Sequence, residues 1–332
     1  MKRQHLIAIV LAIVLGLVAA ACGDDDQATV IQSGERPDDT TTDTDESDTA
    51  ADDEGSAFPV TVTATNGEVT IHDEPQAIVS LSPTGTEMLF AIGAGDQVVA
   101  VDEYSYFPEE APVTELSGNQ PNIEAIAGYE PDLVVLSGDP GDVADGLGQL
   151  DIPVVVLTAA VDFGDTYSQI EVLGAATGHV GDAAELVSQM QTDIDEIVAG
   201  LPERSEPMTY FHELDDGLYS ITSETFIGHV YGLLGLVSIG DEAPAAADSS
   251  YPQLSAEFII DRDPDFVFLA DTQCCDQSAE TVAARPGWEN LTALGTERVI
   301  VVNEDIASRW GPRTVDFLRE VAAEVTATAP VG

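Results

Sequence analysis

The chain has 332 residues, with 61 acidic against ten basic residues and a formal net charge of −51 at pH 7. This length is enough for two domains of ordinary size. The strong negative charge argues against a nucleic-acid partner and against docking on anionic lipid, because both need positive charge to meet phosphate.

The first 22 residues have the order of an export signal. A basic start at residues 1–3 precedes an apolar run at residues 6–18, and three alanines then lead to Cys22. The run is shorter than the ~20 residues that span a bilayer, so an export signal is favoured over a transmembrane anchor. Small residues before a Cys resemble a bacterial lipobox, although Ala19 stands where Leu is commoner. That resemblance implies that Cys22 is acylated and anchors an exported protein to the outer face of the cytoplasmic membrane.

Residues 23–56 have a different composition from the rest of the chain. They hold 13 acidic residues against Arg36 alone, many Thr and Ser, and no aromatic residue. Such a segment cannot bury enough apolar surface to fold. We therefore expect an acidic, disordered tether between the anchor and the folded part.

The first element expected after the tether is a β-hairpin. Alternating β-branched residues at 60–65 and 68–71 flank Asn66-Gly67, a strong short-range hairpin signal. Short apolar runs then alternate with helical stretches. The expected strands are residues 78–81, 98–101, 133–136 and 154–157, and the expected helices are 87–92, 122–127 and 143–150. Such alternation predicts a parallel sheet covered on both faces.

A long amphipathic helix is expected in the middle of the chain. At residues 181–201 apolar side chains recur every four positions, Asp182 is a plausible N-cap, and Pro202 ends the pattern. The alternation then resumes, with strands at 208–212, 266–269 and 299–302 and helices at 225–234, 257–262 and 313–326. The chain thus divides into an N-terminal lobe (57–175), a linking helix (176–202) and a C-terminal lobe (203–332).

One internal repeat supports two similar lobes. Residues 122–137 align without gaps on residues 255–270, and six of the sixteen positions are identical, among them Glu124 and Glu257. Both segments read as a helix, a Pro-Asp turn and a buried strand. Chance similarity of α/β units is the alternative. Two lobes of this kind face each other across a cleft, where ligands usually bind.

These features together resemble the helical-backbone class of periplasmic binding proteins, in the branch that serves importers of cobalamin, haem and ferric siderophores. The resemblance rests on residues 78–101, on the repeated segments and on residues 308–313. Within the branch the chain looks most like the cobalamin-binding proteins, at residues 104–110 and 251–257. It implies an α/β fold with two Rossmann-like lobes, central parallel sheets and one long rigid helix between them.

The resemblance also implies a role for Glu124 and Glu257. In this family an exposed carboxylate on each lobe meets Arg side chains of the importer's membrane subunits. Two anionic points on rigid lobes would fix the docking register. The alternative is that each Glu favours the start of its helix through the helix dipole.

The candidate ligand-binding residues lie in loops expected at the cleft. Ser82 and Thr84 offer hydroxyls at a helix start, with helix capping as the alternative. The aromatic residues suit a flat macrocycle or a catecholate; they are Tyr104, Tyr106, Tyr210, Tyr251 and Trp310. The resemblance implies that Tyr104 packs on a corrin. At Gly118 the sequence departs from the cobalamin pattern, which has a Trp there.

Charged and sulfur-containing residues complete the candidate site. Arg309 is expected to bind an anionic group of the ligand, while Arg313 is expected to have a structural role. His212 either contacts a metal centre or is hydrogen-bonded at its strand end. Cys274 and Cys275 either form a vicinal disulfide in an oxidising compartment, which we favour, or stay reduced.

The predicted function is that of a lipid-anchored, monomeric substrate-binding protein. It would capture cobalamin or a ferric-siderophore-like metal chelate and deliver it to the permease and ATPase subunits of an ABC importer. Haem, zinc or manganese transport and a non-transport lipoprotein are the alternatives. The sequence lacks nucleophile, phosphate-loop and metal-ligand motifs, so we expect no enzyme, no cofactor and no resident metal.

Overall fold

The computed structural model describes residues 57–327. The predicted export signal, Cys22 and the acidic tether lie outside the described residues. Within the described part, none of the helices combines the length and hydrophobicity needed to cross a membrane.

Five parallel strands form the sheet of the N-terminal lobe, in the order β5-β4-β3-β6-β7. The strand bounds are β3 Ile78–Leu81, β4 Val98–Asp102, β5 Val113–Leu116, β6 Leu133–Leu136 and β7 Val154–Val156. The helices of this lobe are α1 Pro83–Ala91, η1 Ala94–Gln97, α2 Ile123–Ala127, α3 Val143–Gly148 and α4 Phe163–Thr177. Strands β3, β6 and β7 are buried at every position, as expected for strands covered on both faces.

Four parallel strands form the sheet of the C-terminal lobe, in the order β11-β10-β8-β9. The strand bounds are β8 Met208–Glu213, β9 Leu236–Ser238, β10 Phe266–Leu269 and β11 Val299–Val301. The helices are α6 Phe226–Leu233, η2 Ile239–Glu242, η3 Pro244–Ala247, α7 Ala256–Arg262, α8 Thr272–Cys275, α9 Ala279–Ala283, η4 Trp288–Asn290, α10 Thr292–Gly295, α11 Glu304–Ala307 and α12 Thr314–Ala327. Two parallel sheets in two lobes confirm the predicted fold class.

The sequence repeat corresponds to a repeat of structure. The side chains of Asn122 and Ser255 cap α2 and α7 in the same way, and β6 and β10 follow these helices. Asp132 accepts a hydrogen bond from the backbone N–H of Ala77, just before β3, and Asp265 accepts one from Thr209 in β8. Because β3 pairs with β6 and β8 with β10, each Pro-Asp turn ties a strand to its neighbour at the same place.

The hairpin formed by β1 (Val60–Ala64) and β2 (Gly67–Ile71) is confirmed, and its turn lies against the edge of β7. The amide of Asn66 donates to the carbonyl of Val154 at 2.9 Å and accepts from the N–H of Val156 at 3.1 Å. Gly67 has φ +105°, a conformation that favours glycine. The hairpin thus covers one sheet edge that would otherwise leave backbone groups unpaired.

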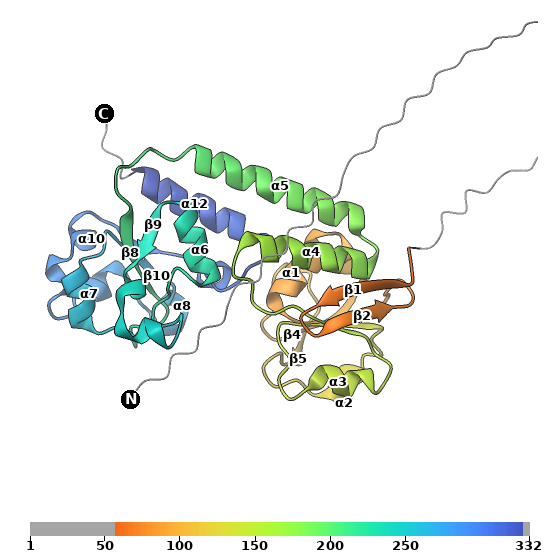
Figure 1. Ribbon diagram of the computed structural model, residues 1–332. Coiled ribbons are helices and arrows are strands. Elements are labelled where there is room, and N and C mark those ends of the chain that lie inside the picture. Colours follow the sequence, from red (N-terminus) through yellow and green to blue (C-terminus); the bar gives the residue numbers. More distant parts are fainter. Residues whose placement is uncertain (1–56, 328–332) are drawn as a thin grey trace, which may run out of the picture. The chain divides into compact units, whose positions relative to one another are not determined.

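The long helix agrees with the expected residues 181–201 within two positions, but it is shorter than the expected linking segment 176–202. Helix α5 spans Val180–Ala199 and packs against α4 and α12 (Figure 1). The residue at its N-cap is His179, and Asp182 lies within the first turn, so the prediction that Asp182 caps the helix is wrong. Residues 176–177 end α4, because Gly178 at φ +84° closes that helix in a left-handed cap. The two helices are therefore separate.

Candidate ligand-binding site

A pocket of about 660 Å³ lies at the carboxyl ends of strands from both sheets. Its N-terminal-lobe walls follow β3, β4 and β6, and its C-terminal-lobe walls follow β8, β10 and β11. The lining residues are Pro83, Thr84, Tyr104, Tyr106, Ser137, His212, Leu214, Ala270, Gln273, Cys274, Glu304, Asp305, Ala307, Ser308, Arg309 and Trp310. Ligands of open parallel sheets bind at this edge, and the volume is within the usual range for small-molecule sites.

A smaller pocket of about 160 Å³ adjoins the first. The two share His212, Leu214, Arg309 and Trp310 among their lining residues, and Tyr251 lines the smaller one. Together they extend the candidate site towards α6.

The structure brings together most of the predicted site residues. Thr84, His212, Arg309 and Trp310 line the larger pocket with the two loop tyrosines. Tyr104 and Tyr106 are each 52 % exposed. Half-exposed aromatic rings at a concave site offer faces on which a planar ligand can stack.

Two predicted ligand-binding residues are placed elsewhere. Tyr210 is fully buried, with its ring 4.3 Å from that of Tyr231, so the prediction that it lines the pocket is wrong. It lies on the same face of β8 as His212 but two residues earlier, so its side chain is within the hydrophobic core rather than at the end of the strand. The hydroxyl of Ser82 accepts the N–H of Gly85 at 3.0 Å and is buried, which fits the alternative of a helix cap.

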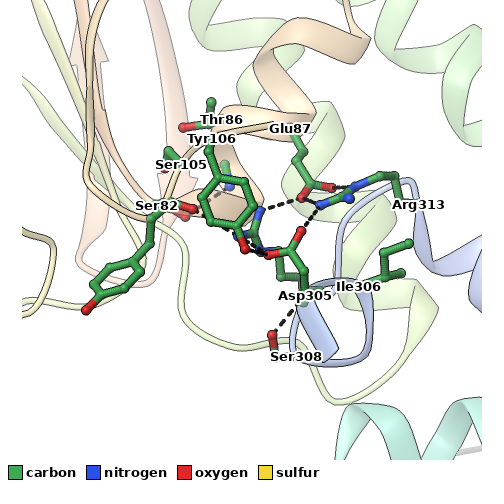
Figure 2. Close-up of polar contacts among 12 residues, drawn as sticks. Ser82, Thr86, Glu87, Ser105, Tyr106, Asp305, Ile306, Ser308 and Arg313 are labelled. Carbon is green, nitrogen blue, oxygen red and sulfur yellow. Dashed lines mark hydrogen bonds and ion pairs between the residues drawn. The ribbon is translucent and has the colours of Figure 1, made fainter. Parts of the chain in front are cut away.

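Arg309 and Arg313 belong to a buried ion-pair network. Figure 2 shows Arg313 between Glu87 and Asp305. Arg309 donates to Glu87 of α1 at 2.7 Å and also pairs with Asp305. Arg313 donates to the other oxygen of Glu87 at 3.0 Å and to Asp305 at 2.7 Å, and its guanidinium lies 3.9 Å from the centre of the Phe107 ring. The guanidinium of Arg309 is therefore already paired with two carboxylates, which disfavours the expected binding of an anionic ligand group.

The tyrosine loop is tied to this network. The hydroxyl of Tyr106 donates to Asp305 at 2.6 Å, and Arg309 donates to the carbonyl of Tyr104 at 2.9 Å. Burial and the hydrogen bond to Asp305 raise the pKa of Tyr106, so its hydroxyl keeps its proton and remains a donor. Both tyrosines are thus held by groups of the other lobe.

His212 is a neutral side chain at the pocket wall. Burial lowers its pKa to about 3. Its Nδ1 lies 2.9 Å from the hydroxyl of Tyr231, which orients the ring. When Nδ1 donates to that hydroxyl, Nε2 is left as an acceptor or a metal ligand; when Nδ1 accepts from it, Nε2 carries the proton and is a donor.

Sequence reasoning missed a group of carboxyls behind the pocket. Glu213 and Asp271 are fully buried, and Arg285 donates to Glu213 at 2.7 Å. Burial, together with the charge of Glu213, raises the pKa of Asp271 to about 7. The one signal in the sequence is position, since Glu213 is the last residue of a strand and Asp271 follows the apolar run 266–270.

Cys274 and Cys275 form a disulfide, as predicted, and Cys274 lines the larger pocket.

Gly118 is explained by close packing. A Cβ atom there would lie 2.7 Å from the carbonyl oxygen of Leu81 and 3.0 Å from a carboxylate oxygen of Asp102. Neither Trp nor any smaller side chain fits without a backbone shift.

Glu124 and Glu257 occupy equivalent positions, each the second residue of its helix. Both are exposed. Within residues 57–327 neither takes part in an ion pair. This geometry is compatible both with docking to a permease and with a favourable interaction of each Glu with the start of its helix.

Comparison with known proteins identifies the family. The model of the periplasmic binding protein family matches residues 78–306. The chain belongs to the periplasmic binding protein family. These are transport-associated binding proteins rather than enzymes, which confirms the predicted absence of catalysis.

Members of this family similar to the chain include the ABC transporter substrate-binding lipoprotein YvrC of Bacillus subtilis, 32 % identical over 85 % of this chain and 90 % of the relative. A cobalamin-binding protein of Halobacterium salinarum is 32 % identical over 81 % of this chain and 75 % of the relative. The structure of the periplasmic vitamin B12 binding protein BtuF of Vibrio cholerae is 25 % identical, with a TM-score of 0.60 over 76 % of this chain and 98 % of that one.

Proposed function

We propose that this periplasmic binding protein captures a corrinoid of the cobalamin type and delivers it to an ABC importer. The observation that carries the proposal is the pocket between the lobes, with two half-exposed tyrosines on one wall. Each ring stacked on a flat macrocycle contributes about 1 kcal/mol. The relatives from H. salinarum and V. cholerae, named for cobalamin and vitamin B12, support the same ligand class.

The charge of the pocket favours cobalamin over anionic chelates. Arg309 is the one Arg or Lys side chain among the lining residues, and Glu87 and Asp305 neutralise it. A ligand with several carboxylates would meet no free cation there, whereas the amide groups around a corrin need hydrogen-bond partners. Thr84, Ser137 and Gln273 supply such partners.

Export, anchoring and docking complete the proposal. Acylation of Cys22 would hold the protein at the outer face of the cytoplasmic membrane, with residues 23–56 as the tether. The permease would recognise Glu124 and Glu257, whose exposure and matched helix positions support a paired docking contact. We expect the protein to act as a monomer.

Haem is the second candidate, because neutral His212 offers a ring nitrogen at the pocket wall. An axial bond from His212 would shift the haem absorption spectrum. His212→Ala would abolish that shift, while cobalamin binding would change little.

Calorimetric titration with cyanocobalamin, haemin and a ferric hydroxamate tests the ligand directly. We expect cyanocobalamin to bind most tightly, and Tyr104→Ala to weaken binding about fivefold, the equivalent of one lost stacking contact. Tyr129→Ala, at an exposed tyrosine outside both pockets, is the matched control. Absence of heat and of any change in melting temperature with all three ligands would contradict the proposal.

A further inference from the structure

The two lobes differ sharply in their positive charge. Residues 57–202 contain no Lys and no Arg, and all seven Arg residues after residue 56 lie beyond residue 203. A buried carboxylate of the N-terminal lobe can therefore pair with Arg or Lys only by reaching the other lobe. Glu87 is such a carboxylate, since 2 % of its side chain is exposed.

Glu87 holds both Arg side chains of the loop between α11 and α12. Each of its carboxylate oxygens accepts a hydrogen bond from a guanidinium, one from Arg309 and Arg313 together and the other from Arg313. Asp305 pairs with the same two Arg residues from within the C-terminal lobe. Two cations thus face two anions, and the network is neutral as a whole.

The network also reaches residues that line the pocket, since Tyr106 lies against Asp305 (Figure 2). Arg309 and Asp305 line the pocket and hold Tyr104 and Tyr106 through the hydrogen bonds described above. Glu87 is not among the residues that line this pocket. It therefore acts on the ligand site through the groups it holds.

We infer that Glu87 is a positioning residue that fixes the separation of the two lobes and thereby the width of the ligand cleft. Its pairs with Arg309 and Arg313 join α1 to the loop before α12. Removing the carboxylate leaves two buried guanidinium groups facing Asp305 alone. A buried charge without a partner is unfavourable, so the loop would move to reach water and release the tyrosine wall.

A second contact supports the idea of a fixed loop. The indole N–H of Trp310 donates to Gln169 of α4 at 2.8 Å, and the hydroxyl of Thr166 donates to the carbonyl of Trp310 at 3.0 Å. The segment between Arg309 and Arg313 is thus bound to the N-terminal-lobe side at both its charged and its aromatic residues. This arrangement leaves little freedom for opening while Glu87 is in place.

The test measures the lobe separation in the ligand-free full-length protein. Spin labels would be placed at Leu150 and Val237, exposed positions in the two lobes, in a Cys22→Ser background. We expect a single narrow distance distribution with Glu87 intact and a broader one in Glu87→Gln. Asp265→Asn is the matched control, because it makes the same change to a half-buried, hydrogen-bonded carboxylate at the opposite end of the C-terminal sheet.

A double variant separates positioning from stability. Glu87→Gln with Arg313→Gln leaves Arg309 balanced by Asp305, so we expect the melting temperature to recover while the distance distribution stays broad. A narrow, unchanged distribution in either variant would overturn the inference.

Ligand binding provides the second readout, which rests on the proposed function. We expect cyanocobalamin to dissociate at least about tenfold faster from the double variant than from the parent protein. An unchanged dissociation rate beside a broad distribution would refute control of the cleft by Glu87. If the parent protein fails to bind cyanocobalamin, the proposed ligand is wrong, and the distance measurement still decides the role of Glu87.

Discussion

Asp271 shows how a single residue can couple this fold to pH. Both its carboxylate oxygens are buried, and within the described part of the chain neither has a conventional hydrogen-bond donor. The groups that face it are Glu213, Arg285 and Glu304, two anions and one cation. A proton on Asp271, donated towards Glu213, removes this excess negative charge, which agrees with its raised pKa of about 7.

The pKa of Asp271 predicts how stability changes with pH. The folded protein holds this proton up to about pH 7, whereas the unfolded chain loses it near pH 4. The contribution of Asp271 to the free energy of unfolding therefore falls as the pH rises from about 4 to about 7. His212 acts in the opposite direction, because burial lowers its pKa, so its contribution is lost as the pH falls below about 6.5.

The substitution Asp271→Asn separates the effect of the Asp271 carboxyl on the pH dependence of stability from the effect of His212. The amide keeps a donor towards Glu213 and does not titrate, so we expect the melting temperature of the variant relative to the parent to rise between pH 5 and pH 8. Glu257→Gln, at an exposed carboxylate, should show a constant difference. A difference that is equally constant for Asp271→Asn would show that Asp271 is ionised throughout.

At the scale of elements, the helices that follow β3 and β8 begin alike. Ser82 and Thr225 each accept the N–H of a glycine three residues later, Gly85 and Gly228. Gly228 packs closely, since a Cβ atom there would lie 2.1 Å from the carbonyl oxygen of Thr222. The close approach of helix and loop is what requires glycine at this position.

Substitution of two glycines of α6 by alanine should change the free energy of unfolding in opposite directions. Gly228→Ala should lower the free energy of unfolding by about 1–3 kcal/mol, because the methyl group displaces the backbone of Thr222. Gly232→Ala should raise it by roughly 0.5–1 kcal/mol, because no atom lies within 4 Å of the added Cβ and alanine restricts the unfolded chain. Urea unfolding measures both. Equal changes in the free energy of unfolding would mean that helix propensity, rather than contact with Thr222, determines the effect of alanine at both positions.

The predicted elements agree best where turn residues bound a buried apolar run. Strands β6 and β10 have the expected bounds, because a Pro-Asp turn precedes each of them. Strand β5 was missed since most of its side chains are not buried. Strand β9 was also missed, although β7 and β11, which are equally short, were predicted. Helix α4 was missed because its apolar residues follow no clear period in the sequence, and its packing against α5 and β1 buries them.

At the scale of the whole molecule, the paired carboxylates give a transport prediction. Glu124→Arg with Glu257→Arg should abolish ligand uptake by cells while the affinity of the purified protein stays within about twofold, because both residues are exposed and outside the ligand pockets. Glu130→Arg with Glu289→Arg changes the charge equally, at one exposed glutamate in each lobe, and is the matched control. Loss of affinity in the first pair would place these residues in ligand binding instead.

The sequence by itself determined the two-lobed parallel fold, the family and the loops that form the cleft. These features follow from local order along the chain, namely apolar runs, turn residues and one repeated segment. The tertiary structure decided which side chains of those loops remain available to a ligand. Burial removed Tyr210 from the predicted site, and pairing with Glu87 neutralised Arg309. Such pairing joins residues more than two hundred positions apart, a distance at which no local pattern specifies the partner.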